Sequence, residues 1–131
     1  MCDAAGPCEA GWAEPVPADC PLPGAESANG LTLYRLFNGS VLTAEHFWSH
    51  VRLGLPTGGA TPCRACSVSL VNSLDLARRK ALLPRFRGYK VAQLSLTAQS
   101  GPIHDPKASS GHVDWWPCGG FAVLAVASEV D

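Results

Sequence analysis

The first 30 residues constrain the fold most, because they contain no pattern from which a core could be built. They hold five prolines, four glycines and seven alanines, together with five acidic residues and no lysine or arginine. Their apolar residues neither alternate nor recur every three to four positions, so the segment has no face to bury. We therefore expect an irregular acidic leader over residues 1–30 and a single small α/β domain over residues 31–131.

The leader and the domain carry charges of opposite sign. Residues 31–131 hold ten basic and six acidic residues, a balance of +4 with histidine neutral, against −5 for the leader. This attraction favours a leader that lies back on the domain. A balance of +4 without a concentrated basic stripe argues against a nucleic-acid partner. No run approaches the roughly 18 apolar residues of a membrane span, so no membrane partner is expected.

The six cysteines bear on the compartment of the protein. The N-terminus shows neither the basic region nor the following apolar run of a secretory signal. This predicts a cytoplasmic location, where the reducing environment keeps the thiols free.

The domain is expected to alternate between strands and helices. "LTLYRLF", residues 31–37, alternates as a strand does, and residues 44–55 repeat at helical spacing. A second helix is expected between Ser73, as its cap, and Pro84. Further strands are expected over residues 66–70, 89–96, 112–116 and 121–128, with a loop over residues 97–111. The order β-α-β-α-β-loop-β-β predicts an α+β fold with a small mixed sheet and two helices, in which the apolar run 121–128 is a strand buried on both faces.

"PCRAC", residues 62–66, matches the second half of the zinc deaminase signature His-x-Glu…Pro-Cys-x-x-Cys. Upstream, Glu45 is in place but Thr43 stands where a zinc ligand is needed, which argues against a deaminase. Cys63 and Cys66 remain candidate ligands of a structural zinc, which needs about four ligands. The favoured interpretation is two ordinary thiols in a turn, so zinc is not expected.

Arg35 is the most unusual single residue of the domain. It shares one strand face with Leu31, Leu33 and Phe37. A buried guanidinium costs several kcal/mol unless it is paired, so this position favours an anion or a cleft. The planar fork of arginine suits a phosphate group. Two alternatives stay open: an exposed position at a twisted strand end, and an internal ion pair with Asp114 or Glu129.

The segments "LYRLF" and "CSVSL", separated by a helix, resemble the order of elements in ADP-ribosyltransferase-type domains. The resemblance implies that Arg35 holds the phosphates of NAD and that Ser67 or Ser69 belongs to the second motif. The late glutamate of that family has only Glu129 as a counterpart, and its position does not match. Residues 31–130 are also similar to small bacterial proteins that run from a "LYR" strand to a late "GH…W" strand, which implies no function.

"GHVDWW", residues 111–116, is the second candidate patch. In an extended segment His112 and Asp114 share a face, as a base and its orienting carboxylate would, although no nucleophile can be assigned. Trp115 and Trp116 are candidates for stacking on a ligand or a partner. The favoured alternative is that one tryptophan fills the core. His46 and His50, four residues apart, are interpreted as surface histidines.

Two hypotheses of function follow from the sequence. The first is a small domain that binds NAD or a related phosphorylated ligand through Arg35, with Ser67, Ser69, His112 and Trp115 as further ligand-binding candidates. The second is a non-catalytic module that binds a protein partner through its tryptophans or its acidic leader. The catalytic residues are not predicted.

Overall fold

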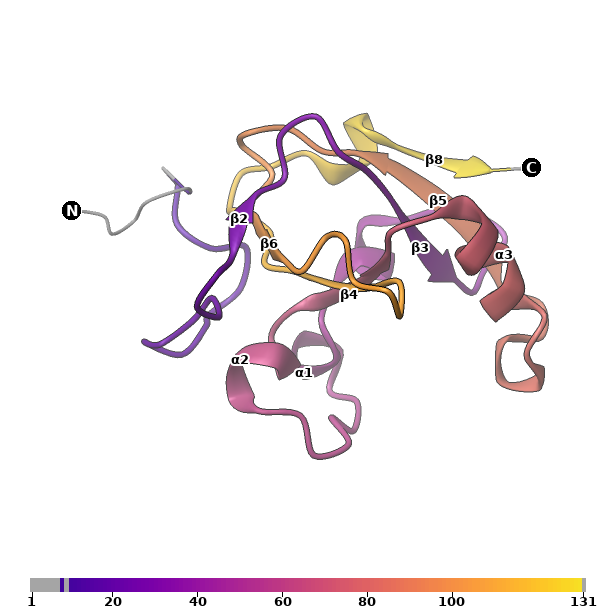
Figure 1. Cartoon of the computed structure of the whole chain (residues 1–131), viewed down its shortest axis with the longest axis horizontal. Coiled ribbons are helices and arrows are strands. Elements are labelled where there is room, and N and C mark those ends of the chain that lie inside the picture. The colour runs from indigo at the N-terminus through magenta and orange to yellow at the C-terminus, as the bar shows by residue number, and fades with distance from the viewer. Residues whose placement is uncertain (1–7, 9, 131) are drawn as a thin grey trace.

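The computed structural model describes Cys8 and residues 10–130, and within them one antiparallel sheet of seven strands in the order β2-β6-β7-β4-β3-β5-β8 (Figure 1). The strands are β2 (Glu26–Ser27), β3 (Thr32–Phe37), β4 (Val68–Val71), β5 (Lys90–Ser95), β6 (Pro102–His104), β7 (His112–Trp115) and β8 (Ala127–Val130). The helices are α1 (His50–Leu53), α2 (Pro62–Ala65) and α3 (Leu74–Ala81), with 3-10 turns η1 (Ala44–Phe47), η2 (Pro84–Phe86) and η3 (Val123–Ala125).

Strand β3 organises the sheet because its two faces serve two separate cores. Leu33 and Phe37 point into the main core, which also contains Trp115. Tyr34 and Leu36 point the other way. They pack in a second core with Val71, Val91 and Ala77, and Ala77 belongs to α3. The alternation predicted from "LTLYRLF" is therefore confirmed, and it puts Arg35 on the face of Leu33 and Phe37.

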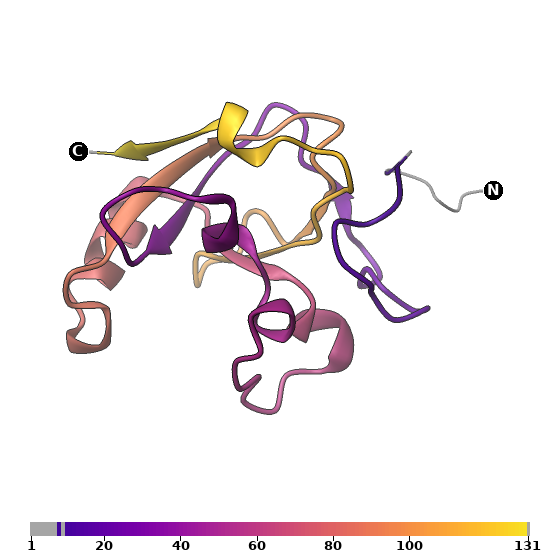
Figure 2. The same cartoon turned by 180° about the vertical axis from the view of Figure 1, so that it is seen from behind.

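Helix α3 forms where the sequence predicts it. The Ser73 hydroxyl accepts a hydrogen bond from the Leu76 amide and caps the first turn. Asp75 and Arg79 form an i,i+4 ion pair of 2.9 Å on the exposed face. The helix lies across β3 and β5, whereas α1 and α2 lie together on a long excursion below the sheet (Figures 1 and 2).

The predicted helix over residues 44–55 is divided into η1 and α1. The break falls at Ser49, which is 1% exposed and whose hydroxyl bonds the carboxylate of Glu14. The same hydroxyl accepts a hydrogen bond from the backbone amide of Arg52 and so caps the start of α1 as a separate helix. Gly54 ends α1 in the left-handed conformation, with φ of 74°.

Three other expectations about the sheet are wrong. All its pairings are antiparallel, so the sheet is not mixed. The expected loop 97–111 contains β6, which pairs with β2 and β7. The apolar run 121–128 is not a strand buried on both faces. It forms η3 and the start of β8, an edge strand paired with β5 and largely exposed at Ser128 and Glu129.

The leader is tied covalently to the domain. Disulfides join Cys8 to Cys118 and Cys20 to Cys63, so the expectation of free thiols is wrong for these four cysteines. Trp12 bridges to Cys118, and the leader contributes β2 and the buried Ala28. The described residues of the leader are mostly irregular and are part of the folded unit. Cys66 is buried as a free thiol, and Cys2 lies outside the described residues.

Two observations bear on the environment of the chain. No helix in the described ranges is long and apolar enough to cross a lipid bilayer. The two disulfides favour an oxidising compartment over the reducing cytoplasm that the sequence predicted.

Candidate functional site

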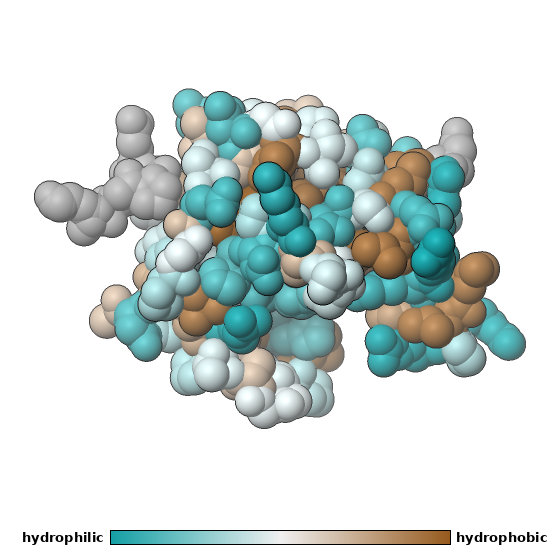
Figure 3. All heavy atoms as spheres, in the orientation of Figure 1, coloured by the Kyte–Doolittle hydropathy of each residue, from teal (hydrophilic) through white to brown (hydrophobic). Residues whose placement is uncertain are grey.

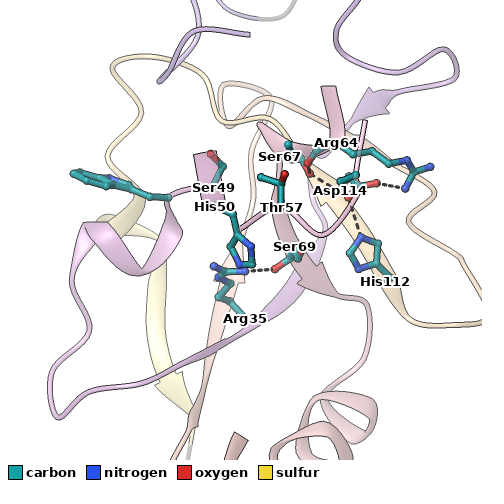
Figure 4. Close-up of a pocket in the computed structure, with 12 residues that line it drawn as sticks. Arg35, Ser49, His50, Thr57, Arg64, Ser67, Ser69, His112 and Asp114 are labelled. Atoms are coloured by element: carbon teal, nitrogen blue, oxygen red, sulfur yellow. Dashed lines mark hydrogen bonds and ion pairs between the residues drawn. The ribbon is translucent and has the colours of Figure 1, made fainter. Parts of the chain in front are cut away.

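A cavity of about 240 Å³ opens where β3 and β4 separate. The two strands share a single registered pair, Tyr34 with Val71, and then diverge. The chain between them, which carries η1, α1 and α2, forms the opposite wall. Figure 4 shows the side chains that converge on this space from β3, β4, β7, α1 and α2. The lining residues are Arg35, Trp48, Ser49, His50, Thr57, Ala60, Arg64, Ala65, Ser67, Ser69, His112 and Asp114.

Arg35 spans the gap between the diverging strands. Its Nε donates to the carbonyl of His46 at 3.0 Å, and one terminal nitrogen donates to the carbonyl of Ser69 at 2.8 Å. A guanidinium has five N–H groups, so three remain after these two bonds. Among the described residues no carboxylate forms an ion pair with Arg35. Burial lowers the pKa of Arg35 to about 10, which leaves the group charged at neutral pH.

Asp114 is the centre of a second polar group on the same cavity. The residue is 3% exposed, and its carboxylate accepts hydrogen bonds from Arg64 at 2.9 Å, from His112 Nε2 at 2.9 Å and from the Ser67 hydroxyl at 3.1 Å. Burial by itself raises the pKa of Asp114, but the bonds and charges of His112, Ser67 and Arg64 together lower it below its ordinary value. Asp114 is therefore an ionised carboxylate that holds three side chains lining the cavity.

A second cavity of about 550 Å³ adjoins the first, and Arg35, His50, Ser69 and His112 line both. Its other walls are largely apolar and come from β3, β4, α1 and η2. They include Leu36, Phe37, Leu53, Leu55, Leu70, Val71, Phe86 and Tyr89. The two cavities together have the size and the apolar lining with few polar groups that are typical of small-molecule sites.

The charges around the cleft favour an anion. In the first cavity the cations are Arg35 and Arg64, and the one carboxylate, Asp114, is engaged by Arg64. The second cavity adds Lys80 as a cation and Glu45 as an anion. Arg35 is thus the cation at the junction whose charge is not balanced by a carboxylate of the described chain.

Four of the five ligand-binding candidates from the sequence line this one cavity: Arg35, Ser67, Ser69 and His112. The ion pairs considered for Arg35 are wrong, because Asp114 pairs with Arg64 and Glu129 pairs with Lys90. The alternative of a freely exposed side chain is wrong as well, since Arg35 is half-buried.

Trp115, the fifth candidate, does not reach the cavity. It is 0% exposed, and its indole N–H donates to the carbonyl of Ser100. Trp116 is 1% exposed and donates to the carbonyl of Cys63. The tryptophans therefore fill the interior and offer no surface for stacking on a partner.

The candidate zinc ligands are placed in ways that argue against a metal. The sulfur of Cys63 is bonded to Cys20 and is no thiolate. Burial, with a smaller effect of the Glu14 charge, raises the pKa of the Cys66 thiol, which keeps it protonated at neutral pH. The described residues contain no group of three or more His, Cys, Asp or Glu side chains placed to hold a metal ion.

Sequence reasoning missed several residues of the cleft. Arg64 lies inside "PCRAC", a motif whose cysteines suggest a metal site, and its partner Asp114 lies 50 residues further along the chain. Ser49 lies in the break between η1 and α1, and Thr57 lies in the loop after α1, so the helical pattern expected over residues 44–55 did not indicate that either lines the cavity. His50 is exposed, as its interpretation as a surface histidine predicts, but its place in both cavities was not predicted.

The Asp114 network predicts a pH-dependent contribution to stability. Because the folded-state pKa of Asp114 is lowered, its contribution is present above the unfolded value of about 3.9 and is lost as the pH falls through the folded value. We expect Asp114→Asn to lower the free energy of unfolding by about 2 kcal/mol at pH 7 and much less at pH 3. Urea unfolding at both pH values measures this difference.

Asp75→Asn is the matched control, because Asp75 forms an exposed ion pair with Arg79. We expect a change within about 0.5 kcal/mol at both pH values. An Asp114→Asn effect of the same size at pH 3 and pH 7 would contradict the assignment of an ionised, network-bound carboxylate.

Comparisons of the chain with protein-family models, with curated proteins and with solved structures found no match.

Proposed function

We propose that the cleft binds a small phosphorylated ligand, NAD or a related compound, with a phosphate at Arg35. The observation that carries this proposal is a half-buried guanidinium without a carboxylate partner among the described residues, placed at the junction of two cavities. An anion at this point would accept hydrogen bonds from the remaining N–H groups of Arg35 and would offset the cost of partly burying the guanidinium.

The division of the cleft supports a ligand with two unlike parts. The first cavity, of about 240 Å³, is lined mostly by polar side chains, with Arg35 and Arg64 as its arginines. The second, of about 550 Å³, has apolar walls that include Phe86 and Tyr89. A phosphate at Arg35 would leave the larger cavity for a ring or another apolar group of the same ligand.

The proposal is binding and does not extend to ADP-ribosyl transfer. Glu129, the counterpart of the late glutamate in the transferases, lies on edge strand β8 and pairs with Lys90 at 3.6 Å. It lines neither of the two cavities. The position that would orient the ribose in that family therefore has no carboxylate from Glu129.

The test is calorimetric titration with NAD and with inorganic pyrophosphate. We expect saturable binding of at least one of them to the unmodified chain, and a loss of about 10- to 100-fold in affinity for Arg35→Gln, since charge-assisted bonds contribute about 1.5–3 kcal/mol. Arg35→Lys should lie between the two, because lysine keeps the charge but cannot form a bidentate pair.

Arg79→Gln is the matched control, because Arg79 is 70% exposed in its side chain and lies on the outer face of α3. It should bind as the unmodified chain does. All titrations are made well below the melting temperature of each variant, because Arg35→Gln also removes two bonds to backbone carbonyls. No binding of either compound at millimolar concentration, or equal binding by Arg35→Gln, would refute the proposal.

The alternative of a protein-interaction module has lost its aromatic surface, whereas the acidic leader stays a candidate surface, with Asp19 and Glu26 exposed. The tryptophans are buried, and the leader is held by disulfides at Cys8 and Cys20. Apolar side chains do gather at the end of α3, where Leu82 is 84% exposed and Leu83 42% (Figure 3). Nothing in the structure indicates which partner would cover them.

A further inference from the structure

The three histidines that line the larger cavity differ in how their ring nitrogens are used. His46 uses both: its Nδ1 accepts the amide of Thr43 at 2.9 Å, and its Nε2 donates to the carbonyl of Asn38 at 2.9 Å. No nitrogen of His46 is left for proton exchange with a ligand. His46 is therefore a structural residue that closes the turn at the start of η1.

His50 and His112 each use one nitrogen and keep the other. His50 Nδ1 lies 3.1 Å from the carbonyl of Pro56, an acceptor, so Nδ1 carries the hydrogen. His112 Nε2 lies 2.9 Å from the carboxylate of Asp114 and carries the hydrogen for the same reason. His50 Nε2 and His112 Nδ1 have no partner among the described residues. Each ring therefore keeps one nitrogen with a free lone pair, and both residues line the cleft.

The two histidines lie around one anion site. Both line the two cavities together with Arg35 and Ser69. In Figure 4 His50 lies next to Arg35 and Ser69, and His112 lies across from them beside Asp114. We propose that His50 and His112 are an acid–base pair that hydrolyses a phosphodiester bound at Arg35. This inference rests on the proposed function, because it needs a phosphate at Arg35.

The reaction needs only water as the second reactant. One histidine, neutral, takes a proton from a water molecule as its oxygen bonds to phosphorus. The other, protonated, donates its proton to the leaving oxygen as the bond between that oxygen and phosphorus breaks. Arg35 compensates the charge on the non-bridging oxygens. The products are a phosphomonoester and an alcohol, and the two histidines end with their protonation states exchanged until solvent restores them.

The charge of the site favours a diester over a monoester. A diester carries one negative charge, whereas a monoester carries about 1.5 to 2 at neutral pH. In the first cavity Arg35 offers one positive charge without a carboxylate counterion in the described chain, because Arg64 is engaged with Asp114. This single positive charge matches the single negative charge of a diester substrate.

Asp114 acts as a positioning residue for His112. It fixes the tautomer in which Nδ1 keeps its lone pair, and it compensates the positive charge of the ring after proton uptake. Arg64 and the Ser67 hydroxyl hold the carboxylate in this place. The four side chains therefore form a chain of contacts from α2 and the residues between α2 and β4 to the catalytic ring on β7.

The test uses two diesters of equal charge. Bis(4-nitrophenyl) phosphate has a good leaving group, and its hydrolysis is followed by release of 4-nitrophenolate. Diphenyl phosphate has a much poorer leaving group and measures binding. We expect turnover by the unmodified chain with a bell-shaped pH profile, and a fall in kcat of at least about 100-fold for His50→Gln and for His112→Gln. Both variants should bind diphenyl phosphate within about threefold of the unmodified chain.

His104→Gln is the matched control, because His104 lies on β6 and lines neither cavity of the cleft. It should keep full turnover. His50 is exposed, so His50→Gln is expected to fold and keeps the test decisive if His112→Gln does not. Binding of diphenyl phosphate without any release of nitrophenolate, or turnover that persists in His50→Gln, overturns the acid–base pair and leaves the binding proposal standing. Failure to bind diphenyl phosphate, pyrophosphate and NAD removes the binding proposal itself.

Discussion

Replacing both cysteines of the Cys8–Cys118 disulfide by serine is expected to lower the free energy of unfolding by about 4–5 kcal/mol. The two residues are 110 positions apart, so the bond closes a loop that includes nearly all of the described chain. The loss of a cross-link over such a loop increases the conformational freedom of the unfolded state more than a short loop would. Urea unfolding of the double variant Cys8→Ser/Cys118→Ser measures the change.

The second disulfide provides the matched comparison. Cys20 and Cys63 are 43 positions apart, so Cys20→Ser/Cys63→Ser should cost about 4 kcal/mol, slightly less than the first pair. Against a total stability of about 5–15 kcal/mol, either loss leaves a marginal fold. If both double variants unfold at the urea concentration of the unmodified chain, the leader is not held to the domain as the structure shows.

Trp115→Ala is expected to lower the free energy of unfolding by about 3–5 kcal/mol. Trp115 is 0% exposed, lies in the main core and meets Phe121 edge to face, with ring centroids 6.2 Å apart. Removing the indole leaves a large cavity and takes the N–H donor from the carbonyl of Ser100. Urea unfolding monitored by circular dichroism at pH 7 gives the value.

Two controls separate burial from the mere presence of an aromatic ring. Trp115→Phe keeps most of the apolar volume and should cost less than Trp115→Ala. Leu82→Ala removes an apolar side chain that is 84% exposed and should change stability by no more than about 0.5 kcal/mol. A cost for Trp115→Ala as small as that for Leu82→Ala would show that Trp115 is not the core residue of this account.

Sequence periodicity predicted the elements whose pattern is local. β3 follows from the alternation of "LTLYRLF", and α3 follows from the Ser73 cap and the Asp75–Arg79 pair. The prediction of a strand buried on both faces over residues 121–128 was wrong, because apolar composition does not show whether a strand has neighbours on both sides. β8 pairs with β5 and is an edge. The break at Ser49 could not be predicted either, since it depends on Glu14, 35 residues earlier.

The cleft was partly predictable because one of its residues violates a local pattern. A charged residue between Leu33 and Phe37 indicates a special environment, and this identified Arg35. The tertiary partners had no comparable signal. Arg64 and Asp114, or Cys20 and Cys63, meet only after the chain has folded, and neither pair lies at a spacing typical of a local motif. The absence of a secretory pattern likewise predicted free thiols where two disulfides form.

The central claim is that the guanidinium of Arg35 receives a phosphate group. The most direct measurement is nuclear magnetic resonance of the arginine Nε–H groups in the unmodified chain during separate titrations with NAD and with inorganic pyrophosphate. It avoids any change to the bonds that Arg35 makes to His46 and Ser69. We predict a saturable shift of the Arg35 signal, with the signal of the exposed Arg79 nearly unchanged. An Arg35 signal that stays in place at millimolar concentrations of both compounds, or that moves only as much as that of Arg79, would contradict the claim.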